Sequence, residues 1–189
     1  IVLDEMQRKQ VILEQVKKLA SGVGGEIPDD PDLLTEVSNL IERPTAMRGK
    51  FEEQYLELPQ EVLISVMKKH QRYFPVVKGG NLLPYFITVR NGDEQGREVV
   101  VDGNEQVIRA RFADAAYFVQ RDQQKKLEDF VPALAKLTFQ ADLGSMLDKT
   151  ERLEKLAAQF SDRLKLDETA AKHVLRAAHL CKADLATEM

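Results

Sequence analysis

The stretch YFPVVKGGNLLPYFITVRNG, residues 73–92, decides the fold, because two runs of aromatic and β-branched residues flank a glycine turn. Residues 73–78 and 82–90 have the composition of strands, and residues 79–81 are turn formers. The second run closes at an Asn-Gly dipeptide, residues 91–92, which favours tight turns. This pattern predicts a β-hairpin. Its two prolines, Pro75 and Pro84, lack an N–H, so we expect them at sheet edges or strand starts.

Three helices are predicted before the hairpin. The first carries Val11, Ile12, Val16 and Leu19 at helical spacing and ends at the glycines of 22–25. A second, 33–41, is stopped by Pro44, because proline disfavours helical geometry in the residue before it. A third starts at Pro59 and ends near His70.

Residues 99–101 are a short strand candidate after the hairpin, and Asn104 is a candidate cap of a long helix on which Ile108, Phe112, Ala115 and Val119 share a face. From Phe130 onward the sequence predicts helix throughout, with Asp167 capping the last one. The fold class is therefore α+β, with an N-terminal helical segment 1–42, a middle α+β unit 43–130 and a helical part 131–189. The chain starts with Ile1 and is predicted helical up to Met189, so we expect it to be cut from a longer protein.

Composition narrows the classes of function. The chain has 189 residues, of which 43% are apolar and 31% charged, enough for ordinary cores and too polar for a membrane span. A single cysteine, Cys181, cannot form an internal disulfide, and no secretory signal begins the chain. We therefore expect a soluble cytosolic protein with no membrane partner.

Charge is unevenly distributed along the chain. The net charge is −4, yet residues 43–126 hold 14 basic against 11 acidic residues, whereas 1–42 and 127–189 are net acidic. The middle is thus the part best able to meet an anionic partner.

One cluster in this middle part suggests RNA contact. Lys68, Lys69, His70, Gln71, Arg72, Tyr73 and Phe74 place cations and aromatic rings at a helix-to-strand junction. Cations bind phosphates, and aromatic faces stack on unpaired bases. The alternative is a solvated helix end, with the lysines at the negative end of the helix dipole and the two rings starting a core strand.

A second candidate is the helix that carries Glu105, Arg109, Arg111 and Asp114. Their spacing of three and four residues suits ordinary ion pairs on a helix surface as well as contact with phosphate. Arg109 and Arg111 are expected on different sides of the helix, which disfavours a joint arginine clamp.

No motif for catalysis is visible. His173, His179, Cys181 and Asp184 lack the spacing of a helical metal site, and there is no phosphate-binding glycine loop, zinc-spaced cysteine set or serine nucleophile elbow. Cys181 is expected to be a small core residue. We predict no catalytic residue and no metal ligand.

Ten strings in order resemble the beta subunit of the bacterial two-subunit glycyl-tRNA synthetases, and they span nearly everything after Leu33. Phe112 departs from the family pattern, which has leucine there, and this exchange is harmless in a core. The strings are LLTEV (33–37), LIERP (40–44), GKF (49–51), LPQEVLI (58–64), MKKHQRYFPV (67–76), LPYFITVRNG (83–92), GNE (103–105), RARFADA (109–115), FQADLGSMLDK (139–149) and LCKADL (180–185).

The resemblance implies a role inside a heterotetramer of two alpha and two beta subunits. The alpha subunit would activate glycine with ATP and magnesium, while the beta subunit binds and positions the glycine tRNA. The middle of the chain resembles the tRNA-binding α/β domain also found in the large subunit of phenylalanyl-tRNA synthetase. The part 131–189 resembles the start of an HD-type helical domain. The chain itself would need no cofactor.

The resemblance also implies candidate RNA-binding residues within its strings. Two other roles stay open: a structural scaffold for subunit assembly, and editing of mischarged tRNA. Editing is disfavoured because a pocket for glycine excludes larger amino acids sterically. The candidates are Lys68, Lys69, His70, Gln71, Arg72, Tyr73, Arg90, Asn91, Asn104, Arg109 and Arg111.

Overall fold

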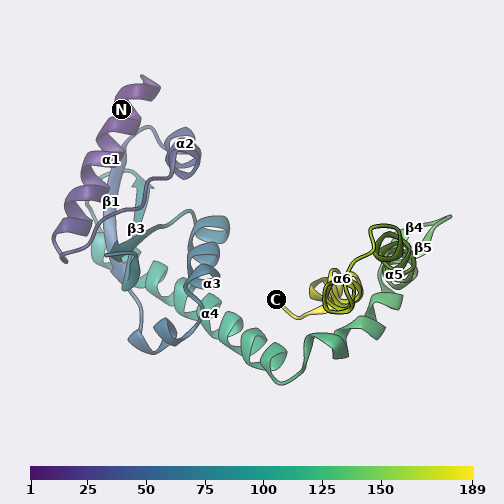
Figure 1. The fold of residues 1–189 in the computed structure, drawn as a ribbon. Helices are drawn as coiled ribbons and strands as arrows, with labels where there is room; N and C mark the ends of the chain where they lie inside the picture. The colour runs from purple at the N-terminus through teal and green to yellow at the C-terminus, as the bar shows by residue number, and fades with distance from the viewer. The chain divides into compact units, whose positions relative to one another are not determined.

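The computed structural model describes residues 1–189 and divides them into two compact units, 1–117 and 118–189, which are described one by one. Helix α4 (Arg97–Gln123) starts in the first unit and ends in the second (Figure 1). The remaining elements of the first unit are α1 (Glu5–Ser21), α2 (Pro31–Asn39), β1 (Pro44–Lys50), η1 (Glu53–Glu57), α3 (Gln60–Ser65), η2 (Val66–His70), β2 (Phe74–Lys78) and β3 (Asn81–Asn91).

The predicted hairpin is confirmed as β2 and β3, which pair antiparallel. Its turn needs glycine, because Gly79 and Gly80 have φ values of +56° and +84°. The sheet has the order β1-β3-β2, so β3 is the middle strand and also pairs antiparallel with β1 along 44–50.

Strand β1 was not predicted from the sequence. Pro44 ends the preceding helical segment as expected, but it also begins a strand. Residues 44–50 contain a glycine, an alanine and two basic residues, and no run of β-branched side chains. Pairing with β3 therefore decides their conformation.

The two prolines of the hairpin occupy different positions. Pro75 lies in the edge strand β2, as predicted, beside an irregularity in the register between Pro75 and Val77. Pro84 lies inside the middle strand, which was not predicted. It lies one residue beyond the last β1 pair, Lys50–Tyr85, and its carbonyl accepts from the backbone N–H of Phe51, a bond that needs no N–H on the proline.

Helices cover both faces of the three-stranded sheet (Figure 1). On one face α1 and α2 pack over Ala46, Phe74, Val76 and Ile87. On the other face α3 and α4 pack over Phe86 and its neighbours. Alternate residues of each strand thus point into two separate cores, as the pleat of a strand requires.

Phe86 organises the second core. Its ring stacks on Tyr73 with centroids 4.6 Å apart and planes 16° apart, and it lies directly over Gly49 of β1. A Cβ atom at position 49 would lie 2.3 Å from Cζ of Phe86, so only glycine fits. Phe51 and Phe112 extend this core as an edge-to-face pair 4.9 Å apart.

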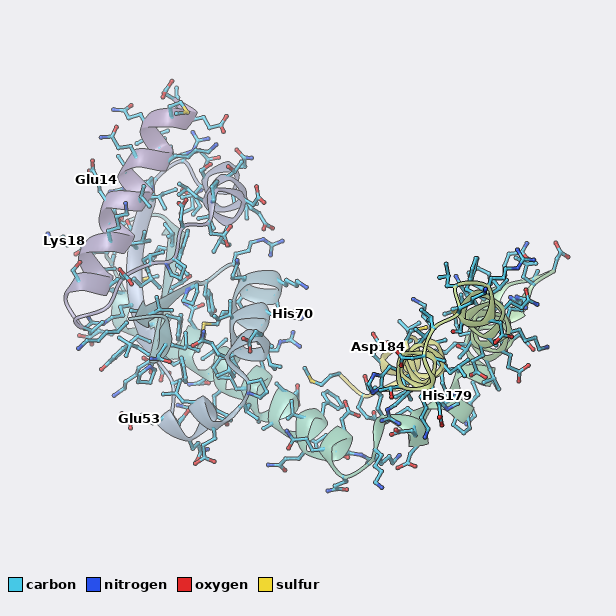
Figure 2. The ribbon with its side chains drawn as sticks, viewed as in Figure 1. Glu14, Lys18, Glu53, His70, His179 and Asp184 are labelled. Carbon is cyan, nitrogen blue, oxygen red and sulfur yellow. The ribbon has the colours of Figure 1, made fainter.

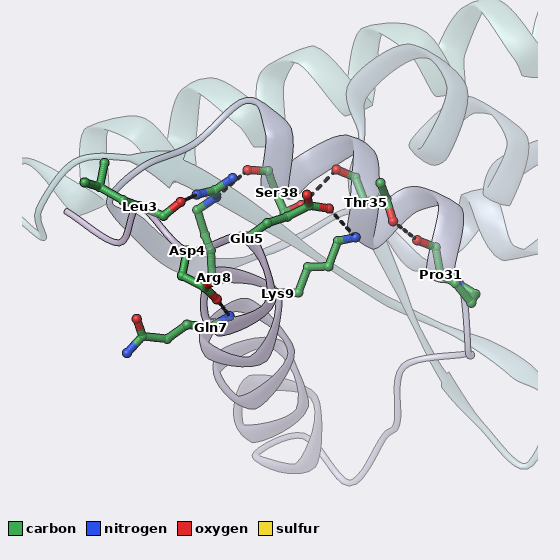
Figure 3. A network of polar contacts seen from close by, with 9 residues as sticks. All are labelled: Leu3, Asp4, Glu5, Gln7, Arg8, Lys9, Pro31, Thr35 and Ser38. Atoms are coloured by element: carbon green, nitrogen blue, oxygen red, sulfur yellow. Dashed lines mark hydrogen bonds and ion pairs between the residues drawn. The ribbon is translucent and has the colours of Figure 1, made fainter.

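Polar contacts hold the N-terminal helix to α2 (Figure 3). Arg8 donates from Nε to the backbone carbonyl of Ser38 at 2.7 Å and from Nη1 to those of Val2 and Leu3. Asp4 caps α1 by accepting from the backbone N–H of Gln7. These bonds tie the start of the chain to the end of α2.

Two local predictions around α4 are wrong. Residues 99–101 are helical and not a strand, and Asn104 lies inside α4 and not at its cap. The Asn104 side chain instead bonds the carbonyl of Val100 and the hydroxyl of Tyr73. The predicted face of this helix is confirmed, since Ile108, Phe112, Ala115 and Val119 are all buried.

The second unit is mainly helical. Asp167 caps α6, as predicted, and Ser145 and Asp148 form a reciprocal capping box on α5. A two-stranded hairpin and an exposed Cys181 depart from the prediction of continuous helix and of a buried cysteine. Its elements after α4 are η3 (Leu127–Lys136), β4 (Thr138–Gln140), β5 (Gly144–Ser145), α5 (Met146–Arg163), α6 (Glu168–Leu180) and η4 (Ala183–Ala186).

None of the helices in the structure has the length and apolar content that crossing a membrane demands.

Replacing Gly49 with alanine should destabilise the first unit by about 1–3 kcal/mol, because the added methyl group overlaps the buried Phe86 ring. The matched control is Gly103→Ala in α4, where an added Cβ meets nothing within 4 Å. That change should stabilise by about 0.5–1 kcal/mol through helix propensity. Urea denaturation followed by circular dichroism measures both, and equal midpoints for the two variants would contradict the packing argument.

Candidate nucleic-acid interface

The predicted cluster 68–73 lies where the helix α3–η2 ends and strand β2 begins. Val66 to His70 form a π-helical turn, and Arg72 has a left-handed φ of +57°. The left-handed conformation costs a residue with a Cβ about 1–2 kcal/mol. Both irregularities are enriched at functional sites, because they hold side chains in directions that regular structure does not offer.

A pocket of about 260 Å³ opens beside this irregular segment. It brings together three of the predicted residues, Gln71, Arg72 and Asn91, which are 20 positions apart in the chain at their extremes. Apolar side chains from the end of α2 and from β3, including Leu40 and Val89, form its other walls.

The pocket lies where the chain entering β2 and the end of β3 separate, a place called the fork of β2 and β3 from here on. The β2 ladder starts at the pair Phe74–Ile87, so the last residues of β3, 88–91, pair only with β1. Residues 71–72 lead into β2 on the other side. The edge of β3 that faces away from β1 is therefore free of a second strand at the pocket.

Hydrogen bonds of Asn91 and Arg90 hold the end of β3 to neighbouring segments of the chain. Asn91 accepts from the backbone N–H groups of Glu42 and Arg43 and donates to the Glu42 carboxylate. Arg90 donates to the carbonyl of Gln95 at 3.0 Å. The Asn91 amide is thus used in holding the pocket wall.

Acidic residues of α2 and its cap neutralise part of the basic cluster. Lys68 forms an ion pair with Asp30, and Arg72 donates from Nε to Glu36 at 2.6 Å. Partial burial opposes ionisation of Asp30, but hydrogen bonds from Lys68 and from the Leu33 backbone outweigh it and lower its pKa. The Arg72–Glu36 pair is exposed, so it contributes little stability and mainly orients the arginine, whereas Lys68 and Asp30 are partly buried.

Lys69 and His70 are exposed and have no internal partner, unlike Lys68 and Arg72. Figure 2 shows His70 on the side of the α3–η2 helix that points away from the sheet, whereas Lys18 lies on the outer side of α1. Because α1 and α3 cover opposite faces of the sheet, Lys18 and His70 lie on opposite sides of the unit.

Tyr73 is buried, with 3% of its surface exposed, and its ring is packed on Phe86. In this structure it cannot offer a face to an unpaired base, so the alternative of a core strand describes it better. Its hydroxyl donates to Oδ1 of Asn104 at 2.6 Å. Burial raises the pKa of Tyr73 to about 12.

Of the two candidate arginines on α4, Arg109 has a partner inside the fold and Arg111 has none. Arg109 donates from Nε to Glu52 at 2.6 Å, which lowers the pKa of the Glu52 carboxyl through that hydrogen bond. Glu105 accepts from the backbone N–H of Lys50 and so docks α4 onto the end of β1, while Arg109 joins α4 to the residue that precedes η1. The sequence predicted ion pairs between residues of the same helix, but the partner of Arg109 is Glu52, which lies outside α4. Arg111 is exposed without a partner.

Sequence reasoning missed two residues that line the pocket: Thr88, which presents a hydroxyl, and Leu40, which is 58% exposed. It also missed Glu36, which lies outside the lining and orients Arg72. The signal that could have found Leu40 is its place at the end of an amphipathic helix, where an apolar side chain lacks a covering element. No sequence spacing links position 36 to position 72.

In the second unit, the histidine-rich stretch forms no metal site. His179 contacts Glu154 through Nδ1 at 2.7 Å, and the exposed Cys181 thiol donates to the carbonyl of Ala178. No three His, Cys, Asp or Glu side chains converge to hold a metal ion.

Comparison with known proteins gives one consistent answer over the whole chain. Residues 1–189 match the family model described as "Glycyl-tRNA synthetase beta subunit". The chain is 49% identical over 189 residues to the glycine–tRNA ligase beta subunits of Oceanobacillus iheyensis and Clostridioides difficile, and 46% identical over 190 residues to that of Bacillus subtilis. All of the chain is covered, but it spans only 27–28% of the length of these relatives.

The family match thus covers both the mixed α/β unit with its small antiparallel sheet and the helical unit that follows it in the chain. The chain belongs to the glycyl-tRNA synthetase beta subunit family.

Alkaline pH should destabilise the first unit through Tyr73. In the unfolded chain a tyrosine titrates near 10. Below pH 10 Tyr73 is therefore protonated in both the folded and the unfolded chain, and its titration does not lower the free energy of unfolding. Between pH 10 and the folded pKa of about 12, only the unfolded chain loses the proton, and stability falls by up to about 1.4 kcal/mol per pH unit. Urea denaturation between pH 9 and 12 should show a steeper loss for the wild type than for Tyr73→Phe, and parallel curves would contradict this.

Proposed function

We propose that this chain is a tRNA-contacting part of a glycyl-tRNA synthetase beta subunit, and that it positions the glycine tRNA without performing chemistry itself. Family membership over the whole chain carries this proposal. The geometry supports it, because cationic and amide side chains meet at an irregular helix-to-strand junction beside a pocket.

The chemistry is assigned to a partner alpha subunit. In this proposal the alpha subunit activates glycine with ATP and magnesium and transfers it to the tRNA that the beta subunit holds. Two alpha and two beta subunits would form the working enzyme. The part of the chain at 131–189 is proposed to be the start of an HD-type helical domain, and 43–130 a tRNA-binding domain.

The contacts that the candidate residues make inside the fold support a division of them into two sets. Lys69, His70, Gln71 and Arg111 have side chains without internal partners, and Arg72 has donors to spare beyond its bond to Glu36. By contrast, the side chains of Tyr73, Asn91 and Asn104 are used inside the fold. We therefore assign RNA contact to the first set and support of the unit to the second.

Subunit assembly is the second candidate function. One observation favours it: Lys68, Arg72 and Arg109 each already have a carboxylate partner, which reduces the positive field available to RNA. Capture of the alpha subunit by this chain in the absence of tRNA, together with unchanged tRNA affinity in the variant described next, would support assembly instead.

Charge reversal at Lys69 should weaken binding of glycine tRNA to the assembled enzyme. Each lost phosphate contact makes the slope of log affinity against log salt about 0.7–0.9 less negative. Fluorescence anisotropy of labelled tRNA at several salt concentrations measures the slope for Lys69→Glu. The control is Lys18→Glu, which makes the same charge change on the outer side of α1 (Figure 2).

Lys18→Glu should leave the slope unchanged. Equal losses in both variants would show only long-range repulsion, and no loss in Lys69→Glu would remove this surface from the tRNA interface.

A further inference from the structure

We propose that the pocket between the end of α2 and the fork of β2 and β3 holds one unpaired base of the bound tRNA. This inference rests on the proposed function and goes beyond it, because it names the site and the part of the RNA that enters it. The base would lie against Leu40 and Val89, with Gln71, Arg72 and Thr88 around it.

The size of the pocket suits one ring system. At about 260 Å³ it is smaller than the 300–1,000 Å³ or so that is typical for larger ligands. A double helix cannot enter such a space. Proteins read RNA sequence mostly at single-stranded loops and ends, whose bases can be turned out and bound one at a time.

The walls combine apolar surface with free hydrogen-bonding groups. Leu40 and Val89 supply apolar contact for the face of a base. The Gln71 carboxamide has two donors and an acceptor, and the Thr88 hydroxyl acts as either. Neither side chain is engaged elsewhere in the fold, whereas the neighbouring Asn91 amide is.

The free edge of β3 adds further donors and acceptors. Residues 88–91 pair with β1 on one side only, because the β2 ladder ends at Ile87. In an antiparallel pair, alternate residues direct their N–H and C=O groups outward. Main-chain groups at this edge are therefore placed to bind the edge of a base.

Arg72 supplies the charge for the phosphate of the same nucleotide. Its Nε donates to Glu36, which fixes the guanidinium while both terminal NH2 groups stay available. A planar guanidinium binds phosphate with two parallel hydrogen bonds. Lys69, on the preceding turn, is placed to contact the next phosphate.

The backbone supports a positioning role for this segment. Arg72 keeps a left-handed φ of +57°, which glycine would adopt without strain. The strained conformation follows a π-helical turn and directs residues 71–72 toward the pocket. A left-handed backbone disfavours an arginine here, and in this proposal the phosphate contact offsets that cost.

The test is Arg72→Gly in the full-length beta subunit assembled with its alpha subunit. Glycine removes the guanidinium and relaxes the backbone, so the denaturation midpoint should not fall. Affinity for glycine tRNA should fall about 10-fold or more, as expected for loss of a charged hydrogen-bonded pair. Lys18→Ala is the control, because it removes one positive charge at an exposed position on the outer side of α1, and it should leave the affinity unchanged.

A second experiment identifies the base. Glycine tRNAs that lack a single base are prepared for each unpaired position, and their affinities are measured with the wild type, Gln71→Ala and Thr88→Val. At one position, loss of the base should weaken binding to the wild type about 10-fold but have little further effect in the variants. Losses that simply add at every position would overturn the pocket.

The two levels of the proposal fail differently. If the wild type binds glycine tRNA with a salt dependence that Lys69→Glu reduces, but no position couples to Gln71 or Thr88, the pocket inference is wrong and the tRNA-contacting role stands. If neither the Lys69 nor the Arg72 variant changes tRNA affinity, both are wrong.

Discussion

The antiparallel pairing of β3 with β1 on one side and β2 on the other is the constraint on which the first unit depends. It places Phe86 over Gly49, where no side chain fits, and this close approach lets the ring stack on Tyr73. Helices then cover the two faces with separate cores. Because the first pair of β2 is Phe74–Ile87, the last four residues of β3, 88–91, extend past β2 and leave the fork in which the pocket lies.

Several charged residues in this unit form ion pairs or hydrogen bonds within the fold. Arg109 joins α4 to η1 through Glu52, while Glu105 bonds the end of β1. Lys68 and Arg72 are held by acidic residues of α2 and its cap. The pairs of Arg72 and Arg109 are exposed and weak in free energy, about 0–1 kcal/mol each, so a phosphate can compete for these two cations at modest cost. Because the acidic neighbours compete for these cations, a polyanion that makes several contacts binds here more readily than a single small anion.

Local pattern was sufficient wherever a segment carried its own signal. The hairpin followed from its glycine turn and its aromatic runs, α1 from apolar spacing and its terminal glycines, and α6 from the Asp167 cap. It failed where the signal lay in another part of the chain. Strand β1 has weak strand propensity and forms because β3 offers hydrogen bonds, and Asn104 looked like a cap but bonds Tyr73 instead.

The sequence by itself determined the family, through ordered strings of residues, and the group of residues at 68–73 where RNA contact is proposed. Only the tertiary structure decided which of them are available. Tyr73 is buried on Phe86, whereas Gln71 and Arg72 meet Asn91 at a pocket. The physical reason is that exposure and hydrogen-bond partners depend on contacts between residues far apart in sequence, such as Glu36 with Arg72, which no local spacing encodes.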